Sequence, residues 1–220
     1  MGEVLTRKCA CCKGVIEIER NSITNVISHK GKYYHKNCFV EMAQRKAASK
    51  SGKPKMWQDA LDDIWTLEAD TKSALEKFFD KDELNTWLLD NYDISLVPSY
   101  FWQMVTDLEG GKYKNKRCKP IGTKTLCACW KWGQRNLNQI SANNKMRGTG
   151  PTNDSQRLLY DLAIIIGKVP NYLSEAAKNA IIETNASHEQ KQNKINYTVI
   201  SKTANENKET DILDLLDEIF

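Results

Sequence analysis

Cysteine and histidine side chains gather near the start of this 220-residue chain. Cys9 and Cys12 form a Cys-x2-Cys pair, and His35 and Cys38 form a His-x2-Cys pair after a spacer of 22 residues. Tight turns let each pair direct two ligand atoms at one ion, and three thiolates with one imidazole complete a tetrahedral zinc site. Such a site keeps no open position for water, so we expect the zinc to be structural rather than catalytic.

Other side chains offer alternative ligands. Cys11 is a surplus thiol that could substitute in the register Cys9-x-Cys11, and His29 could compete with His35. A second zinc could take its sulfurs from Cys118, Cys127 and Cys129, but no Cys or His beyond these lies between residues 39 and 187. We therefore expect these three cysteines to be buried in helices.

The segment between the two ligand pairs predicts the elements that position them. "VIEIE" (15–19) alternates apolar and acidic residues like a strand, a second strand-like piece covers 25–28, and Gly31 is typical of a turn. Gly14 supplies flexibility for the turn after Cys12. A helix over 38–45 then begins at the second pair. A hairpin between ligand pairs with a helix after them predicts a treble-clef-type zinc module over residues 1–45.

"GKYYHKNCF" (31–39) resembles the His-x2-Cys half of LIM domains and of PARP-type zinc fingers. Both join a Cys-x2-Cys knuckle to a His-x2-Cys pair followed by an aromatic residue, here Phe39. The resemblance covers residues 7–42 and implies a zinc-stabilised fold. LIM domains continue with a second cysteine pair that "FVEMAQRK" lacks, and PARP-type fingers use a longer spacer. The resemblance therefore implies neither the two-zinc arrangement of LIM domains nor the nick-recognising surface of PARP-type fingers for this chain.

The rest of the chain predicts a mainly α fold. Residues 46–56 are small, polar and basic and read as a linker, and residues 57–184 show apolar spacing typical of a helical domain. Gly110 and Gly111 end one predicted helix, and Pro170 ends another that a short helix follows. Residues 185–210 are polar with few apolar residues, which predicts a disordered tether before residues 211–220.

Charge is distributed in blocks. Residues 1–55 carry twelve Lys/Arg against four Asp/Glu, residues 56–109 three against thirteen, and residues 110–150 ten against none. Residues 151–200 balance, and residues 201–220 are acidic. A polyanion attracted by the first and third blocks must avoid the second, so we expect at least two different surfaces.

The third block predicts contact with nucleic acid, DNA or RNA. We expect a mobile arm to track phosphates with its cations and the following helix to add two more. The candidate contacts are Lys112, Lys114, Lys116, Arg117 and Lys119 on the arm, with Lys131 and Arg135 on the helix. A solvated basic loop is the plainer interpretation of the same residues.

Two other functional classes find little support. Residues 84–91 and 99–108 have helix-turn-helix lengths, but the second helix exposes no Arg or Lys, as a major-groove reader would. No credible Ser/His/Asp or Cys/His constellation and no phosphate-binding glycine loop is present. We therefore expect a protein that is not an enzyme, with residues 56–109 as an acidic scaffold.

The last ten residues, "DILDLLDEIF", form an acidic amphipathic pattern. Its predicted apolar stripe consists of Ile212, Leu215, Leu216 and Ile219 beside Phe220. Such a peptide suits helix-in-groove docking to a partner such as a sliding clamp, a polymerase or RNA polymerase. It resembles the partner-recruiting tails of single-stranded-DNA-binding proteins and the clamp-binding tails of phage replication and late-transcription factors. The alternative is that it folds back on the helical domain.

Composition indicates a soluble, intracellular protein, since no signal peptide or membrane-length apolar run is evident and bunched cysteines suit a reducing compartment. The whole chain is similar to uncharacterised accessory proteins of phages of Gram-positive bacteria, which would place it in the host cytoplasm. We expect a zinc-containing regulatory or accessory factor for replication or transcription that associates with nucleic acid. The alternative is a protein-only adaptor or inhibitor of a host protein.

Overall fold

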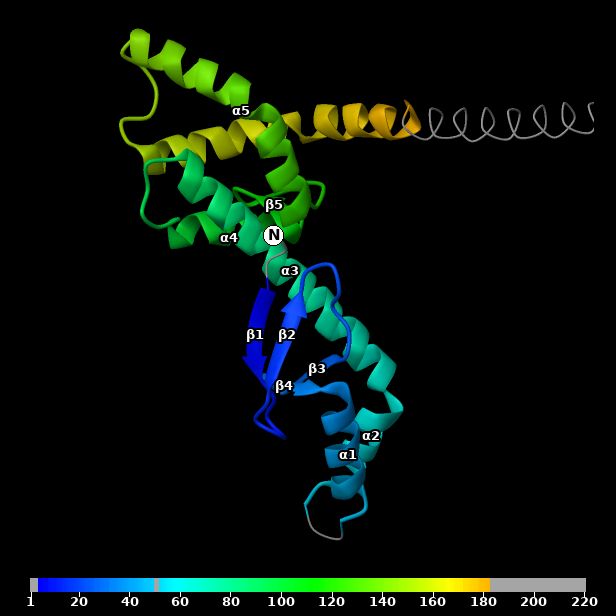
Figure 1. Cartoon of the computed structure of the whole chain (residues 1–220). Coiled ribbons are helices and arrows are strands. Elements are labelled where there is room, and N and C mark those ends of the chain that lie inside the picture. Colours follow the sequence, from blue (N-terminus) through cyan, green and yellow to red (C-terminus); the bar gives the residue numbers. More distant parts are fainter. Residues whose placement is uncertain (1–3, 50–51, 183–220) are drawn as a thin grey trace, which may run out of the picture. The chain divides into compact units, whose positions relative to one another are not determined.

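The computed structural model describes residues 4–49 and 52–182, and the chain divides into two compact units, residues 1–166 and 167–220. The elements in chain order are β1 (Val4–Lys8), β2 (Val15–Glu19), β3 (Val26–His29), β4 (Lys32–His35), α1 (Lys36–Ala47), α2 (Pro54–Asp62), α3 (Ile64–Asn91), α4 (Ser99–Glu109), β5 (Lys112–Tyr113), β6 (Lys116–Arg117) and α5 (Thr123–Met146) (Figure 1). A last helix covers residues 154–182. The predicted class is confirmed, because small N-terminal hairpins precede a helical body. The tether and the acidic peptide lie outside the described residues.

Two β-hairpins build the N-terminal module. β1 and β2 pair antiparallel with Lys8 opposite Val15, so this hairpin encloses the Cys9–Cys12 pair. β3 and β4 pair separately, with His29 opposite Lys32. The turn between them places Lys30 and Gly31 at φ of 51° and 73°, as a two-residue type I′ loop requires. The predicted strand at 15–19 therefore exists, but its partner is β1 rather than the second predicted strand.

The module shares its apolar core with the first helices of the body. Phe39 at the start of α1 is fully buried, and the same cluster of buried side chains contains Leu75 and Phe79 of α3. Between α1 and α3, α2 begins at Pro54, whose missing N–H costs nothing at a first helical position. Residues on both sides of the predicted linker thus pack into one core.

The helical body is organised around Trp130 of α5. Its buried ring lies 6.2 Å from that of Trp87 and 5.9 Å from that of Phe101, which brings α3 and α4 against α5. The indole N–H donates to the Tyr92 hydroxyl at 3.1 Å, and that hydroxyl donates to the buried Asp161 carboxylate at 2.7 Å. Burial raises the pKa of Asp161, and the hydrogen bond from Tyr92 opposes that shift. These two consecutive hydrogen bonds pair the indole, hydroxyl and carboxylate groups, which would otherwise be costly to bury.

The last helix continues through Pro170. Proline lacks the N–H that would bond to the carbonyl of Ile166, which weakens a helix at this point without always ending it. The predicted break at Pro170 is therefore wrong. In the first unit, Gly133 of α5 lets this helix approach closely, because a Cβ atom there would lie 3.0 Å from the Ile165 side chain. None of the helices that the structure describes combines the length and apolar composition of a membrane span.

Candidate metal centre and cationic hairpin

The structure brings the four predicted ligands together. The ligand atoms of Cys9, Cys12, His35 and Cys38 all lie within 4.8 Å of one another. Cys12 Sγ is 3.4 Å and Cys38 Sγ 3.8 Å from His35 Nδ1. Ligands of a tetrahedral zinc at bond lengths of about 2 Å are roughly 3.5 Å apart, so the spacing suits one ion. The cluster can therefore hold a metal ion, as the sequence predicted.

The β1–β2 hairpin forms the knuckle that carries the first pair. The Cys9 N–H donates to the Gly14 carbonyl at 2.8 Å, and the Lys13 N–H donates back to the Cys9 carbonyl at 3.0 Å. The left-handed residue of this turn is Lys13, with φ of 66°. Gly14 does not have a positive φ, so the flexibility predicted for it is not what closes the turn.

His35 is oriented by a backbone contact on the far side of its ring. Its Nε2 lies 3.2 Å from the Val15 carbonyl oxygen, which can only accept a hydrogen bond. Nε2 therefore carries the proton, and the lone pair of Nδ1 faces the Cys12 and Cys38 sulfurs. The next residue is also held, because the Lys36 N–H donates to the Asn25 carbonyl at 2.9 Å where α1 begins. Metal-binding histidines commonly have such a second partner.

The electrostatics of the cluster favour a bound cation. Burial raises the pKa of Cys9, but backbone N–H groups of Cys12, His35 and Cys11 outweigh it and lower that pKa to about 6. Burial and the neighbouring thiols Cys12 and Cys9 raise the pKa of Cys38 to about 12. Three thiolates this close repel one another, so all three ionise together only when a cation compensates them.

The alternative ligands have other surroundings. The His29 ring packs against Phe39 and Trp57, each with a centroid distance of 5.5 Å. Cys11 packs at the edge of the module core. Neither belongs to the Cys/His cluster found among the described residues. His29 is therefore an aromatic-core side chain here, and burial lowers its pKa.

The three later cysteines form no second cluster within residues 4–49 and 52–182. Cys127 and Cys129 are buried in α5, which confirms the expectation for this pair, and burial raises the pKa of Cys127 to about 11. Cys118 is only partly buried and lies at the end of the β5–β6 hairpin, outside a helix.

Residues 112–117, predicted as a mobile arm, form the hairpin β5–β6. Tyr113 pairs with Lys116, and the loop residues Lys114 and Asn115 have φ of 47° and 64°, again a type I′ turn. The base is closed by the Cys118 N–H, which donates to the Gly111 carbonyl at 2.9 Å. We call this segment, residues 112–119, the cationic hairpin.

The cations of the hairpin point to solvent. Lys112, Lys114, Lys116, Arg117 and Lys119 are all exposed. Among the described residues none of these five side chains lies in an ion pair. Lys114 stacks over the Tyr113 ring at 5.4 Å. The predicted site residues of the arm are thus collected on one short, exposed element.

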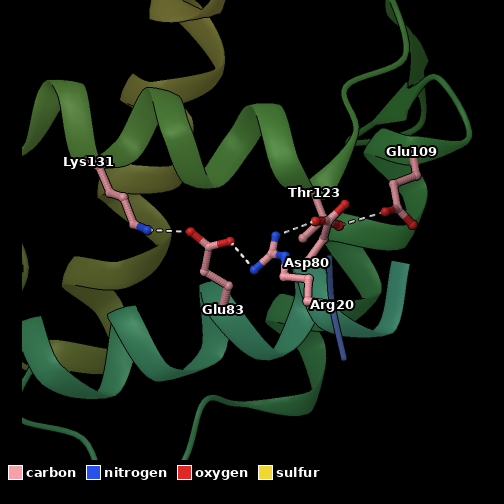
Figure 2. A network of polar contacts seen from close by, with 6 residues as sticks. All are labelled: Arg20, Asp80, Glu83, Glu109, Thr123 and Lys131. Carbon is pink, nitrogen blue, oxygen red and sulfur yellow. Dashed lines mark hydrogen bonds and ion pairs between the residues drawn. The ribbon is translucent and has the colours of Figure 1, made fainter. Parts of the chain in front are cut away.

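The two predicted helical contacts differ from each other. Arg135 is exposed on α5, whereas Lys131 forms an ion pair with Glu83 of α3. Figure 2 shows Glu83 between Lys131 and Arg20, with Arg20 also reaching Asp80 at 2.8 Å. The charge of Lys131 is therefore partly neutralised by a carboxylate of the protein itself.

The polar contacts in Figure 2 join three of the charge blocks, which sequence reasoning did not anticipate. Arg20 comes from the basic N-terminal block, Asp80 and Glu83 from the acidic block, and Lys131 from the second basic block. The Thr123 hydroxyl donates to Glu109 at 2.6 Å, which ties the two ends of the segment that carries the hairpin. Alternating blocks of opposite charge were the only signal in the sequence that could have suggested these pairs.

The family model described as SPbeta prophage protein YorH matches residues 9–216 of this chain. The chain therefore belongs to that family. A search of curated proteins and a search of solved structures each returned no match. The likeness to LIM domains and PARP-type fingers accordingly rests on the ligand pattern.

Proposed function

We propose that this member of a prophage protein family is a non-enzymatic accessory factor that binds nucleic acid through the cationic hairpin. The observation that carries the proposal is the hairpin itself, which presents five exposed cations without an acidic neighbour in residues 110–150. Phosphate backbones bind such an element with release of counterions. A narrow two-stranded hairpin can also enter a groove of duplex DNA.

Zinc is the metal that suits the Cys/His cluster. Three sulfurs and one imidazole nitrogen at tetrahedral spacing are a donor set typical of structural zinc. With four protein ligands no position is left for a reacting water, which favours a structural role. The zinc would hold the two hairpins and the start of α1 in place.

Binding to nucleic acid is tested by a salt titration with a labelled duplex and with a single strand of the same sequence. We expect a Kd that rises steeply with salt. Replacing Lys112, Lys114, Lys116 and Arg117 together by alanine should reduce the slope of log K against log salt by about 3 to 4 for a duplex, since each lost phosphate contact removes about 0.9.

Lys72→Ala/Lys77→Ala serves as the control for a loss of surface charge elsewhere, because both lysines are exposed on α3 within the acidic block. It should leave the slope unchanged. An unchanged slope in the quadruple hairpin variant, or no binding even at low salt, would contradict the proposal.

The second candidate function is a protein-only adaptor or inhibitor of a host protein, with the module and the acidic block as binding surfaces. Carboxylates of the acidic block that remain exposed, such as Asp70 and Glu76 on α3, favour it. We also propose that residues 211–220 recruit a replication or transcription protein. A pull-down with the full chain and with a chain lacking these ten residues tests the recruitment: captured proteins that depend on the peptide support it, and identical capture contradicts it.

A further inference from the structure

The outer edge of β2 carries backbone N–H and C=O groups that are not hydrogen-bonded to another strand of the described residues. β1 is the one strand of the described residues that pairs with β2, and Glu19 at the end of β2 also forms an isolated antiparallel bridge with Ser22. The Cys9 N–H donates to Gly14, so that pair is of the hydrogen-bonded type, and in an antiparallel ladder the types alternate. Residues 16 and 18 therefore bond to β1, whereas residues 15, 17 and 19 direct their N–H and C=O groups away from it.

Two hydrogen bonds agree with this register. The Val15 carbonyl accepts from His35, and the Glu19 carbonyl accepts from the Ser22 N–H at 3.0 Å. No described residue outside the β1–β2 ladder bonds to the backbone of Glu17, which lies midway between them. The open N–H and C=O of Glu17, with the outward N–H of Val15 beside them, are a template for an added strand.

A groove of about 340 Å³ runs along this edge. Its lining comes from β2, from Ser22, Thr24 and Asn25 of the segment that follows, and from His35 of the Cys/His cluster. The Glu17 and Glu19 carboxylates are exposed at the groove and, among the described residues, lie in no ion pair. Because they are two residues apart on a strand, both project to the same side.

We infer that this groove binds an extended peptide that carries lysine or arginine at alternate positions and pairs with β2 as an additional strand. Backbone hydrogen bonds to the Val15 N–H and to the N–H and C=O of Glu17 would supply affinity, and the two carboxylates would select for cations across the strand. The same carboxylates repel phosphates and the acidic segment 211–220, so a basic protein segment is the favoured occupant. The inference does not depend on the cationic hairpin.

The test measures fluorescence anisotropy of a labelled heptapeptide that alternates lysine and valine, with the metal-loaded full chain. Glu17→Lys/Glu19→Lys should weaken binding about tenfold or more at low salt, because it replaces attraction with repulsion. Glu41→Lys, at an exposed position of α1, is the control for a charge reversal elsewhere on the module and should change the Kd less than about twofold. A peptide that alternates glutamate and valine should not bind.

Strand addition is separated from simple charge attraction by amide hydrogen exchange. The Glu17 N–H should exchange more slowly with the lysine peptide bound, and Glu17→Pro, which removes that N–H from an open edge, should abolish binding. If Glu17→Pro does not fold, as judged by metal content and circular dichroism, the charge reversal and the exchange measurement decide. Equal binding by the reversed variant, unchanged exchange at Glu17, or displacement of the peptide by an oligonucleotide that binds the groove would overturn the inference.

Discussion

The two basic regions of this protein use their charge differently. In the N-terminal module, Arg20 binds Asp80 and Glu83, and Lys36 binds Glu68 at 2.6 Å, all on α3. In the cationic hairpin, the five cations have no acidic partner among the described residues. Similar excesses of positive charge therefore fix one element to the helical body and leave the other open to solvent. Composition alone does not distinguish these uses, because tertiary contacts decide which cations remain available.

The acidic block has a role within the molecule that its composition does not suggest. As a bare stretch of thirteen acids against three bases, residues 56–109 would repel a polyanion. Three of these acids, Glu68, Asp80 and Glu83, instead hold the module on α3. The block is thus partly a docking surface for the chain's own N-terminal module.

The largest expected effect comes from removing a ligand of the metal centre. Cys38→Ser should reduce bound zinc, measured by mass spectrometry of the native protein, from one ion per chain to none. Structural zinc supplies about 10 to 16 kcal/mol to folding in small fingers, so the module should unfold. Because Phe39 shares a core with Leu75 and Phe79, we expect faster amide exchange in α2 and the first half of α3 as well.

Cys11→Ser and Cys118→Ser are the matched controls, because each removes a thiol outside the cluster. Both should keep the metal. Zinc retained by the Cys38 variant but lost when Cys11 is replaced in addition would identify Cys11 as a substitute ligand.

A smaller effect should separate the two basic regions directly. Arg20→Ala leaves the Asp80 and Glu83 carboxylates without their arginine partner. Because the Arg20 and Asp80 side chains are only 26% and 19% exposed, the free energy of unfolding should fall by about 1 to 2 kcal/mol. Arg117→Ala removes an exposed hairpin cation and should change it by less than about 0.5 kcal/mol. Urea denaturation measures both.

The same two substitutions should have the opposite ranking in nucleic-acid binding. Arg117→Ala should reduce the salt slope on a duplex by about 0.9, and Arg20→Ala should leave it unchanged. If Arg20→Ala reduced the slope and cost no stability, the division between anchoring and exposed cations would be wrong.

Local rules predicted the members of the Cys/His cluster and several element ends. The spacing of two short ligand pairs identified all four residues of the cluster, because each pair is built by a turn within a few residues. The helix expected near Cys38 begins at Lys36, and α4 begins after Pro98 and ends before Gly110. Cys127 and Cys129 are buried in a helix, as the lack of a fourth metal ligand led us to expect, whereas the same expectation was wrong for Cys118.

Features set by distant contacts could not be predicted in this way. The strand β1, "VLTRK", has a weak pattern of its own and forms because it pairs with β2. The shared core around Phe39 joins apolar faces whose partners a periodicity does not name. The β5–β6 hairpin depends on two non-glycine residues with positive φ, Lys114 and Asn115, of which only the asparagine suggests that conformation.

The smallest expected effect tests Glu83, the carboxylate that joins the two basic regions. The hydrogen bond from Lys131 lowers the pKa of Glu83, burial opposes that shift, and Arg20 lowers the pKa further. A carboxylate with a lowered folded pKa contributes stability that is present above its ordinary value of 4.5 and is lost as the pH falls through the folded value. Because Lys131 and Glu83 are 42% and 33% exposed, the contribution should be below about 1 kcal/mol.

Glu83→Gln should therefore be less stable than the parent chain in urea at pH 7, and the difference should vanish as the pH falls well below 4.5. Asp161, whose pKa burial raises, is present in both proteins, so its titration cancels from the comparison. A difference that persisted at acid pH would assign the effect of Glu83→Gln to packing rather than to the ion pairs.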